Sequence, residues 1–209
     1  MGRKFKLNKD YYDEGVELFN KTEIEFNPGL TVLVGCNGAG KSTLINHLRY
    51  NLSLNDIPHL KYDNLVNGGN IAREDAMKIG DMKKVILLST SSEGENILIN
   101  FGDFIEKVGR KVKWCIENNE KELWILCDAV DSGFSIDNII QFKSVCSLIL
   151  KDAKNLDVYI IAAANSYEMA NSENCLDVYN GKYRTFKSYN TYKNFILKSA
   201  EVKMKRLES

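Results

Sequence analysis

The residues best suited to chemistry lie in one short stretch, TVLVGCNGAGKSTL at positions 31–44. Its spacing matches G-x-x-x-x-G-K-[ST], a turn in which backbone N–H groups at the start of a helix converge on a phosphate. The stretch lies between a predicted strand and a predicted helix, which favours a nucleoside triphosphate site over a chance glycine turn. The residues that fit the pattern are Gly35, Asn37, Gly38, Ala39, Gly40, Lys41, Ser42 and Thr43.

The polar residues of this turn have distinct expected roles. Lys41 is expected to reach the β- and γ-phosphate oxygens, Ser42 to ligate Mg²⁺, and Thr43 to add a hydroxyl near the α-phosphate. A second metal ligand should end a neighbouring strand, and LWILCD at 123–128 supplies Asp128. An ordinary strand-end aspartate is the alternative, but the DSG turn that follows favours the metal role.

With these residues in place, the chain resembles the ABC-type P-loop ATPases. GCNGAGKST is similar to their Walker A form, G-x-N-G-x-G-K-S-T, and Asp128 matches Walker B. Residues 131–135, DSGFS, resemble the D-loop, and SSEGE at 91–95 resembles the signature L-S-G-G-Q/E. The matching signature positions are Ser92, Gly94 and Glu95, and the resemblance spans roughly residues 22–170.

The resemblance implies ATP and Mg²⁺ as cofactors and a homodimer that forms across ATP. In this family two subunits dock head to tail, and each nucleotide is held between one Walker A and the partner's signature. Ser92 and the Gly94 amide would then bind the γ-phosphate held by the partner subunit. Tyr11 or Tyr12 would stack on adenine, although a surface tyrosine explains either residue equally well.

Three positions depart from the family pattern. Ala129 replaces the glutamate that follows Asp128, and Asn165 stands at the switch histidine, where it can hydrogen-bond but not carry charge. The Q-loop glutamine is missing because Gln141 is the only Gln in the chain, which leaves Asn64 or Asn67 as substitutes. The candidate catalytic residues are Lys41, Asp128, Asn165 and Asp131, and Glu93 or the partner subunit's Glu95 are further replacements for the lost acid.

Slow hydrolysis follows from these departures, because general-base catalysis is worth about 10²–10⁴-fold. Val130, in place of the family's proline, favours natural divergence over an engineered substitution at position 129. The sequence therefore predicts ATP binding more firmly than ATP hydrolysis.

Spacing indicates the branch of the family. Lys41 and Ser92 are 51 residues apart, too few for a transporter cassette's full helical domain or for long coiled-coil arms. Glu95 and the DSG-x-S segment resemble the soluble DNA-repair and chromosome-maintenance branch, and small free-standing ATPases of this kind occur in bacteriophage and bacterial genomes. A nucleotide kinase is disfavoured, because the signature would have no role in one.

Two functions remain open. The first is an ATPase or ATP switch that acts on nucleic acid or on a protein bound to it. The second is a regulatory module in which ATP closes the dimer and the dimer recruits a protein partner, with negligible turnover. ATP-dependent dimerisation without appreciable turnover would favour the second.

Composition is typical of a globular protein, with 44% apolar and 27% charged residues among 209. Residues 1–10 carry four basic side chains against one acidic, and residues 182–209 carry eight against two, a net of +3 and +6. These basic termini fit an anionic polymer such as nucleic acid, and solvated surface lysines explain them too. Five unpaired cysteines, no apolar leader and no membrane-length apolar run predict a soluble, cytoplasmic protein with no membrane partner.

Hydrophobic patterning predicts one α/β domain over 1–209, with a mostly parallel sheet flanked by helices. Its parts are an N-terminal β flank at 1–30, a short insert at 53–90, and a C-terminal hairpin and helix at 175–209. Expected strands are 22–26, 30–35, 85–88, 123–128 and 158–164, with a two-residue hairpin turn at Asn180-Gly181. Expected helices begin at Lys41, near Ile97, after Ser135 and at about 191. The second has an apolar stripe of Ile97, Phe101, Phe104, Ile105, Val108 and Val112. The third has one of Ile136, Ile139, Ile140, Val145 and Ile149.

Overall fold

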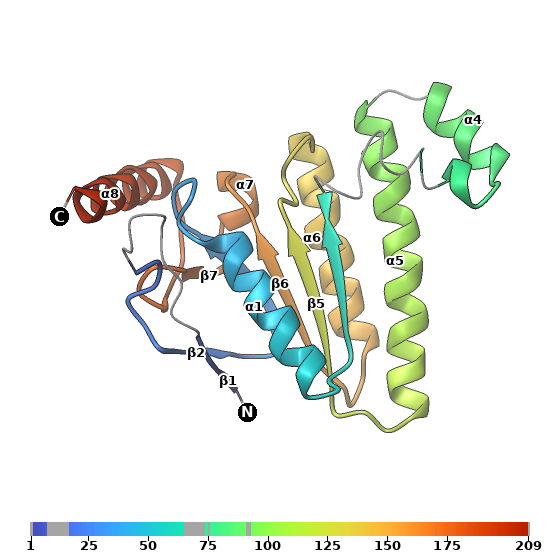
Figure 1. The fold of residues 1–209 in the computed structure, drawn as a ribbon, viewed down its shortest axis with the longest axis horizontal. Helices are drawn as coiled ribbons and strands as arrows, with labels where there is room; N and C mark the ends of the chain where they lie inside the picture. The colour runs from blue at the N-terminus through green and yellow to red at the C-terminus, as the bar shows by residue number, and fades with distance from the viewer. Residues whose placement is uncertain (1, 8–16, 65–73, 75, 91–92, 209) are drawn as a thin grey trace.

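A six-stranded sheet forms the centre of the molecule. The computed structural model describes residues 2–7, 17–64, 74, 76–90 and 93–208. The strand order is β4-β5-β6-β3-β7-β8, and Figure 1 shows helices on both faces of the sheet. All neighbouring strands are parallel except β7 and β8, so the predicted α/β fold is confirmed. The strands are β3 (Gly29–Val34), β4 (His59–Asp63), β5 (Glu122–Asp128), β6 (Asp157–Ala163), β7 (Asn174–Asp177) and β8 (Lys182–Arg184).

Alternation along the central strands builds two separate cores. On β5, Leu123 and Ile125 belong to a cluster with α5 (Glu93–Glu117) and α6 (Ile136–Asp152). Trp124 and Leu126 belong to the cluster on the opposite face, with α1 (Lys41–Leu54). A strand buried on both faces must be apolar at every position, which is why LWILC reads as a continuous apolar run.

The antiparallel flank is a second, two-stranded sheet. β1 (Arg3–Lys6) pairs with β2 (Glu23–Phe26) in antiparallel register, with Arg3 opposite Phe26. Phe5 and Phe26 both meet Trp124 edge to face, with ring centroids 5.0 and 5.9 Å apart. The N-terminal strands therefore cover the α1 face of the sheet, and the predicted antiparallel flank is confirmed.

The predicted strand at 85–88 is wrong, because these residues lie in helix α4 (Met82–Thr90). Val85 and Leu88, three positions apart, are buried, whereas Ile86 and Leu87 are exposed. A four-residue apolar run fits a buried strand or one side of a helix equally well, so its pattern alone does not decide. The strand of the six-stranded sheet that the sequence did not predict is β4, which lies next to β5 at the edge of the sheet.

Two local details also differ from expectation. In α6 the inward residues are Ile139, Phe142 and Cys146, whereas Ile136 and Ile140 are 60% and 59% exposed. In the hairpin, Asp177 pairs with Lys182, so residues 178–181 form a four-residue loop that contains Asn180-Gly181 rather than a two-residue turn. The other predicted helices agree: Leu44, Leu48 and Leu52 of α1 are buried, as are Ile97, Phe101, Phe104 and Val108 of α5.

The chain ends in two more helices. The short helix α7 (Tyr167–Ala170) follows β6, and α8 (Tyr189–Leu207) follows the hairpin. Figure 1 shows α8 at the side of the molecule opposite to α4.

All five cysteines are free and buried. Burial raises the pKa of the Cys146 and Cys175 thiols to about 12. Burial also raises the pKa of Cys115 and, more strongly, that of Cys127. These four thiols are therefore protonated at neutral pH, as buried free cysteines commonly are.

Candidate functional site

The glycine-rich loop joins β3 to α1, and two of its glycines are required by its shape. Gly38 and Gly40 have φ of 72° and 96°, in the left-handed region that side chains other than glycine rarely adopt. A Cβ at Gly40 would also lie 2.8 Å from Leu18 Cδ2 and 2.9 Å from a ring carbon of Phe19. Any residue other than glycine would therefore strain the backbone at both positions and, at position 40, also collide with Leu18 and Phe19.

Lys41 folds back over this loop. Its Nζ donates to the carbonyl oxygens of Gly35 and Cys36, at 2.8 and 3.2 Å. Burial lowers the pKa of this ammonium, an effect that the charges of Cys36, Asp131 and Asp128 partly oppose. An anion bound in the loop would further favour the charged form.

Ser42 and Asp128 meet although 86 positions separate them. The Ser42 hydroxyl donates to Asp128 Oδ1 at 3.0 Å, and Asp128 is only 5% exposed. Burial raises the pKa of Asp128, and the hydrogen bond from Ser42 opposes this shift. A hydroxyl and a carboxylate oxygen at this spacing suit Mg²⁺, which usually keeps several waters and takes its remaining ligands from phosphates. The two predicted metal ligands thus lie together and fit the ion.

The position after Asp128 holds no acid. Ala129 has a φ of 49°, and its N–H donates to Asp128 Oδ1 at 3.0 Å. The next residue, Val130, donates its N–H to the carbonyl of Ala163 at 3.2 Å, so the chain bends directly toward the end of β6. Only a methyl group occupies the place where the family carries a glutamate.

The carboxylate of Asp131 accepts hydrogen bonds from backbone N–H groups of another segment. Its Oδ2 accepts hydrogen bonds from the N–H groups of Asn165 and Ser166, both at 2.6 Å. The segment after β5 is thereby joined to the segment after β6. Asp131 and Asn165, predicted separately as catalytic residues, are brought into direct contact through this backbone link.

Asn165 is held from its other side by the C-terminal helix. Tyr192 of α8 donates its hydroxyl to the Asn165 carbonyl oxygen at 2.6 Å. The Asn165 side chain is exposed, so it remains available to a ligand while its backbone is fixed.

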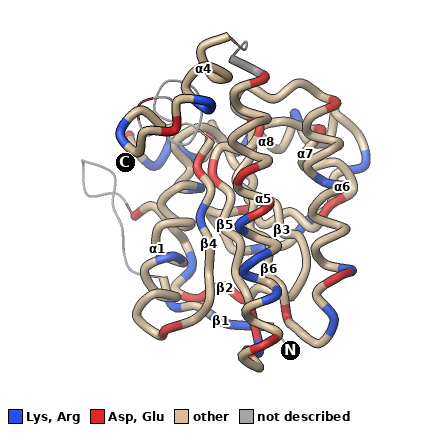
Figure 2. Tube along the Cα trace, turned by 90° about the vertical axis from the view of Figure 1, so that its right-hand side faces the viewer, with Lys and Arg blue, Asp and Glu red and all other residues tan. Residues whose placement is uncertain are grey.

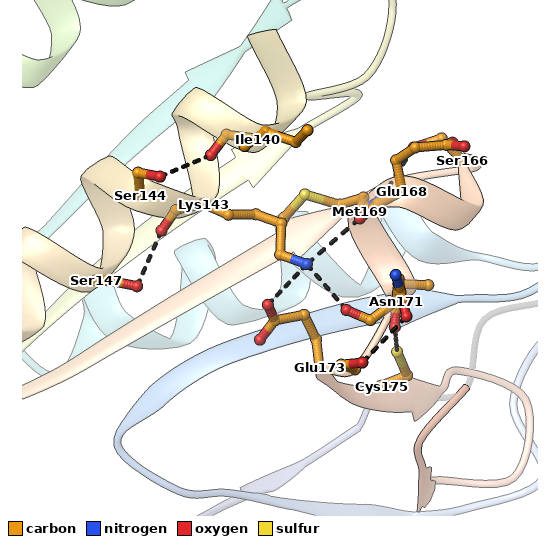
Figure 3. Close-up of polar contacts among 12 residues, drawn as sticks. Ile140, Lys143, Ser144, Ser147, Ser166, Glu168, Met169, Asn171, Glu173 and Cys175 are labelled. Atoms are coloured by element: carbon orange, nitrogen blue, oxygen red, sulfur yellow. Dashed lines mark hydrogen bonds and ion pairs between the residues drawn. The ribbon is translucent and has the colours of Figure 1, made fainter. Parts of the chain in front are cut away.

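Lys143 of α6 anchors the short helix that follows Asn165. Its Nζ donates to the carbonyl oxygen of Asn171 at 2.9 Å and to that of Glu168 at 3.4 Å, and it pairs with Glu173 at 2.9 Å. Figure 3 shows these three groups converging on the ammonium from α7 and the chain that follows it. A cation at the end of a helix satisfies carbonyl groups that have no partner within the helix.

Of the two candidate Q-loop substitutes, only Asn64 is among the described residues. Asn64 directly follows β4 and is buried, with Nδ2 2.5 Å from the Ser132 carbonyl oxygen and Oδ1 2.9 Å from the Tyr62 hydroxyl. Its amide thus links β4 to the D-loop segment. Asn67 lies outside the described residues, as do Tyr11 and Tyr12.

The signature segment opens α5. Ser92 lies outside the described residues, and Gly94 and the exposed Glu95 lie in the first turn of the helix. Figure 1 shows the start of α5 well away from the loop between β3 and α1. In a single chain the predicted signature therefore does not reach the predicted phosphate loop.

Sequence reasoning missed the residues of α8 that contact the glycine-rich loop. Ser199 and Lys203 hydrogen-bond to the backbone of Cys36 and Asn37. A cavity of about 240 Å³ lies between α8, this loop and the β7–β8 hairpin. No local motif marks residues that act on a loop more than 160 positions away, so the sequence carried no signal for them.

Comparisons with known proteins agree with this arrangement. A family model described as an AAA domain matches residues 14–205. Among 32 matching chains of solved structures is an ATP-binding cassette of an ABC transporter in its ADP conformation. It has a TM-score of 0.50 and 15% sequence identity, with 98% of this chain and 99% of that chain covered, and so shows a shared fold.

One further comparison and a search of the described residues for membrane-spanning helices found nothing. No curated protein sequence matches the chain. Within the part of the chain that the structure describes, no helix has the length and apolar character needed to cross a membrane.

Proposed function

Because the chain belongs to the AAA domain family, we propose that it is an ABC-type ATPase or ATP switch that dimerises head to tail around Mg-ATP. The observation that carries the proposal is the Ser42–Asp128 contact of 3.0 Å beside a loop that holds Lys41. In this proposal Lys41 binds the β- and γ-phosphates, and Ser42 and Asp128 hold Mg²⁺, Asp128 through water.

The arrangement of α5 supports the dimer. A helix N-terminus binds phosphate well, but the start of α5 lies far from the phosphate loop of its own chain. A second copy would bring Ser92, Gly94 and Glu95 to that loop. Ile136 and Ile140, both exposed, open α6 directly after the D-loop segment and would be covered in the same interface.

Slow hydrolysis is part of the proposal. Ala129 offers no carboxylate to the attacking water, and Asp131 already accepts two backbone hydrogen bonds. The same observations favour the second candidate function, a regulatory module in which ATP closes the dimer, a protein partner is recruited, and turnover is negligible.

We further propose a DNA-related role, with the basic termini as the contact surface. Two exposed basic residues on α8, Lys193 and Lys198, support it. Figure 2 shows basic and acidic residues interspersed along the elements of the fold. We therefore expect contact with DNA at the basic termini alone. Binding that weakens steeply with salt is the expected result, and no binding at low salt with Mg-ATP present would exclude direct contact.

Molar mass by light scattering, with and without Mg-ATP, tests the central proposal beside a phosphate-release assay. We expect a monomer that becomes a dimer only with Mg-ATP, and Lys41→Met to remain monomeric. Dimerisation without phosphate release would favour the regulatory module. A nucleotide-saturated protein that remains monomeric would contradict the head-to-tail dimer.

A further inference from the structure

Three hydrogen bonds join α8 to the two loops that would meet the triphosphate. Ser199 Oγ accepts the N–H of Cys36 at 3.1 Å, and Lys203 Nζ donates to the Asn37 carbonyl at 3.1 Å. About two turns before Ser199, the Tyr192 hydroxyl donates to the Asn165 carbonyl at 2.6 Å.

Helix periodicity places the three side chains on one side of α8. Positions 192, 199 and 203 follow the i, i+7, i+11 spacing that repeats along one helix face. The loops that they contact follow β3 and β6, which are adjacent strands. A single rigid element therefore spans the phosphate loop and the Asn165 loop.

The contacts at the phosphate loop act on backbone atoms. Ser199 and Lys203 bind an N–H and a carbonyl group, so they constrain the path of the loop rather than any of its side chains. Lys203 also lies so close to Gly38 that a Cβ at that position would collide with its ammonium. A cavity of about 240 Å³ between α8, the loop and the β7–β8 hairpin is lined by both Ser199 and Lys203.

Tyr192 acts as the hydrogen-bond donor to Asn165. Its side chain is buried, and burial raises the pKa of its phenol above the ordinary range, so it stays protonated. The ring packs against Phe186 and Tyr167, with centroids 5.2 and 5.9 Å away. A Tyr192→Phe change would keep this packing and remove only the hydroxyl.

We propose that α8 positions the nucleotide site, with Ser199 and Lys203 as positioning residues for the phosphate loop and Tyr192 as the positioning residue for Asn165. The proposal rests on the function proposed above. The phosphate loop meets phosphates that ATP and ADP share, whereas Asn165 stands where the family reads the γ-phosphate. The two ends of α8 therefore have separable effects on nucleotide binding.

The test compares ATP and ADP affinity by calorimetry for Ser199→Ala, Lys203→Met and Tyr192→Phe, with the exposed Lys205→Met as the matched control. Ser199→Ala and Lys203→Met should weaken ATP and ADP alike, by about three- to tenfold for one lost hydrogen bond. Tyr192→Phe should weaken ATP by about threefold or more and leave ADP within about twofold. Lys205→Met should match the wild type.

Amide hydrogen exchange without nucleotide gives an independent readout. Ser199→Ala should speed exchange at the Cys36 amide, which loses its acceptor, while Lys205→Met should not. Lys203→Met behaving like Lys205→Met, or Tyr192→Phe weakening ATP and ADP equally, would overturn the inference. A wild-type protein that binds neither nucleotide would overturn the proposed function and this inference together, whereas binding with unaltered variants overturns the inference alone.

Discussion

The loop between β3 and α1 and the ends of β5 and β6 form two sides of one candidate site, but only the first side keeps the residues of the family pattern. On the first side, Lys41 and Ser42 keep the residue types of the family pattern, and they contact the loop carbonyls and Asp128. On the second side, Ala129 and Asn165 replace the family's acid and histidine. The polar groups around them bind backbone: Asp131 holds two N–H groups and Tyr192 holds a carbonyl.

From this difference we expect nucleotide binding and hydrolysis to depend on separate residues. A loop that cradles phosphate needs its glycines, its lysine and its hydroxyl, and all of them are present. Activation of the attacking water needs a base at a defined place. The second side has no acid at position 129, and Asp131 and Tyr192 there bind backbone groups. The predictions below change one side at a time.

The largest expected effect comes from restoring the acid. Ala129→Glu should raise the rate of phosphate release by about 10²–10⁴-fold, because a general base is worth that much when its geometry is right. The measurement is steady-state phosphate release with saturating Mg-ATP. Ala129→Gln is the matched control, with similar size and no carboxylate, and should stay near the wild-type rate. Equal rates for both variants would mean that the attacking water does not lie at position 129.

On the binding side, Lys41→Met should weaken ATP by about 10²-fold, because hydrogen bonds to a charged group are each worth about 1.5–3 kcal/mol. Calorimetry or a fluorescent ATP analogue measures this loss. The exposed Lys83→Met is the control and should leave affinity unchanged. Retained affinity in Lys41→Met would contradict the assignment of the loop as the phosphate site.

On the hydrolysis side, Lys143→Met should lower the free energy of unfolding by about 1–2 kcal/mol. The change removes a cation that serves two carbonyl oxygens and Glu173, all partly buried. Urea unfolding measures it, with Lys151→Met, exposed on the same helix, as the control. An unchanged unfolding free energy would show that the network in Figure 3 does not stabilise the fold.

The smallest expected effect concerns Asp128 without nucleotide. Burial raises its pKa above 3.8, so the folded state binds more protons than the unfolded state just above that pH. Stability due to this group is therefore lost as pH rises from 3.8 through the raised pKa, and the deficit persists at pH 7. Asp128→Asn should be more stable than the wild type at pH 7, by about 1 kcal/mol, and the difference should shrink near pH 4.

Urea unfolding at the two pH values measures this difference. Asp152→Asn, exposed at the end of α6, provides the control and should show no such pH dependence. A wild type that is the more stable form at pH 7 would contradict the sign.

Much of the fold was predictable because it depends on local pattern. The apolar runs of β3, β5 and β6 reflect burial on two faces, and the glycine-rich loop is recognisable from its residue types and spacing. The edge strand β4 was missed because only Tyr62 in it is buried, so HLKYD lacks an apolar run. The segment at 85–88 was misread because its side chains pack as a helix, which depends on neighbours that the sequence does not display.

The candidate site was predictable to a similar extent. The pairing of Ser42 with Asp128 was predicted from an acid at the end of a neighbouring strand, whereas β6 lies between β3 and β5 in the sheet. The contacts made by Lys143, Tyr192, Ser199 and Lys203 depend on where a distant helix packs. The spacing of residues in the sequence does not predict such contacts. Long-range packing therefore decided the second side of the site.

The five buried thiols lie in the two hydrophobic clusters on opposite faces of the sheet, so they can report on each cluster separately. Cys36 belongs to the cluster on the α1 face, and Cys115, Cys127, Cys146 and Cys175 belong to the cluster on the α5 and α6 face. An alkylating reagent reaches such thiols readily only when the surrounding structure opens. Mass spectrometry of the wild-type protein after increasing times of alkylation would show which cluster exposes its thiols first. Repeating it with nucleotide would show whether binding protects the thiols of one cluster alone.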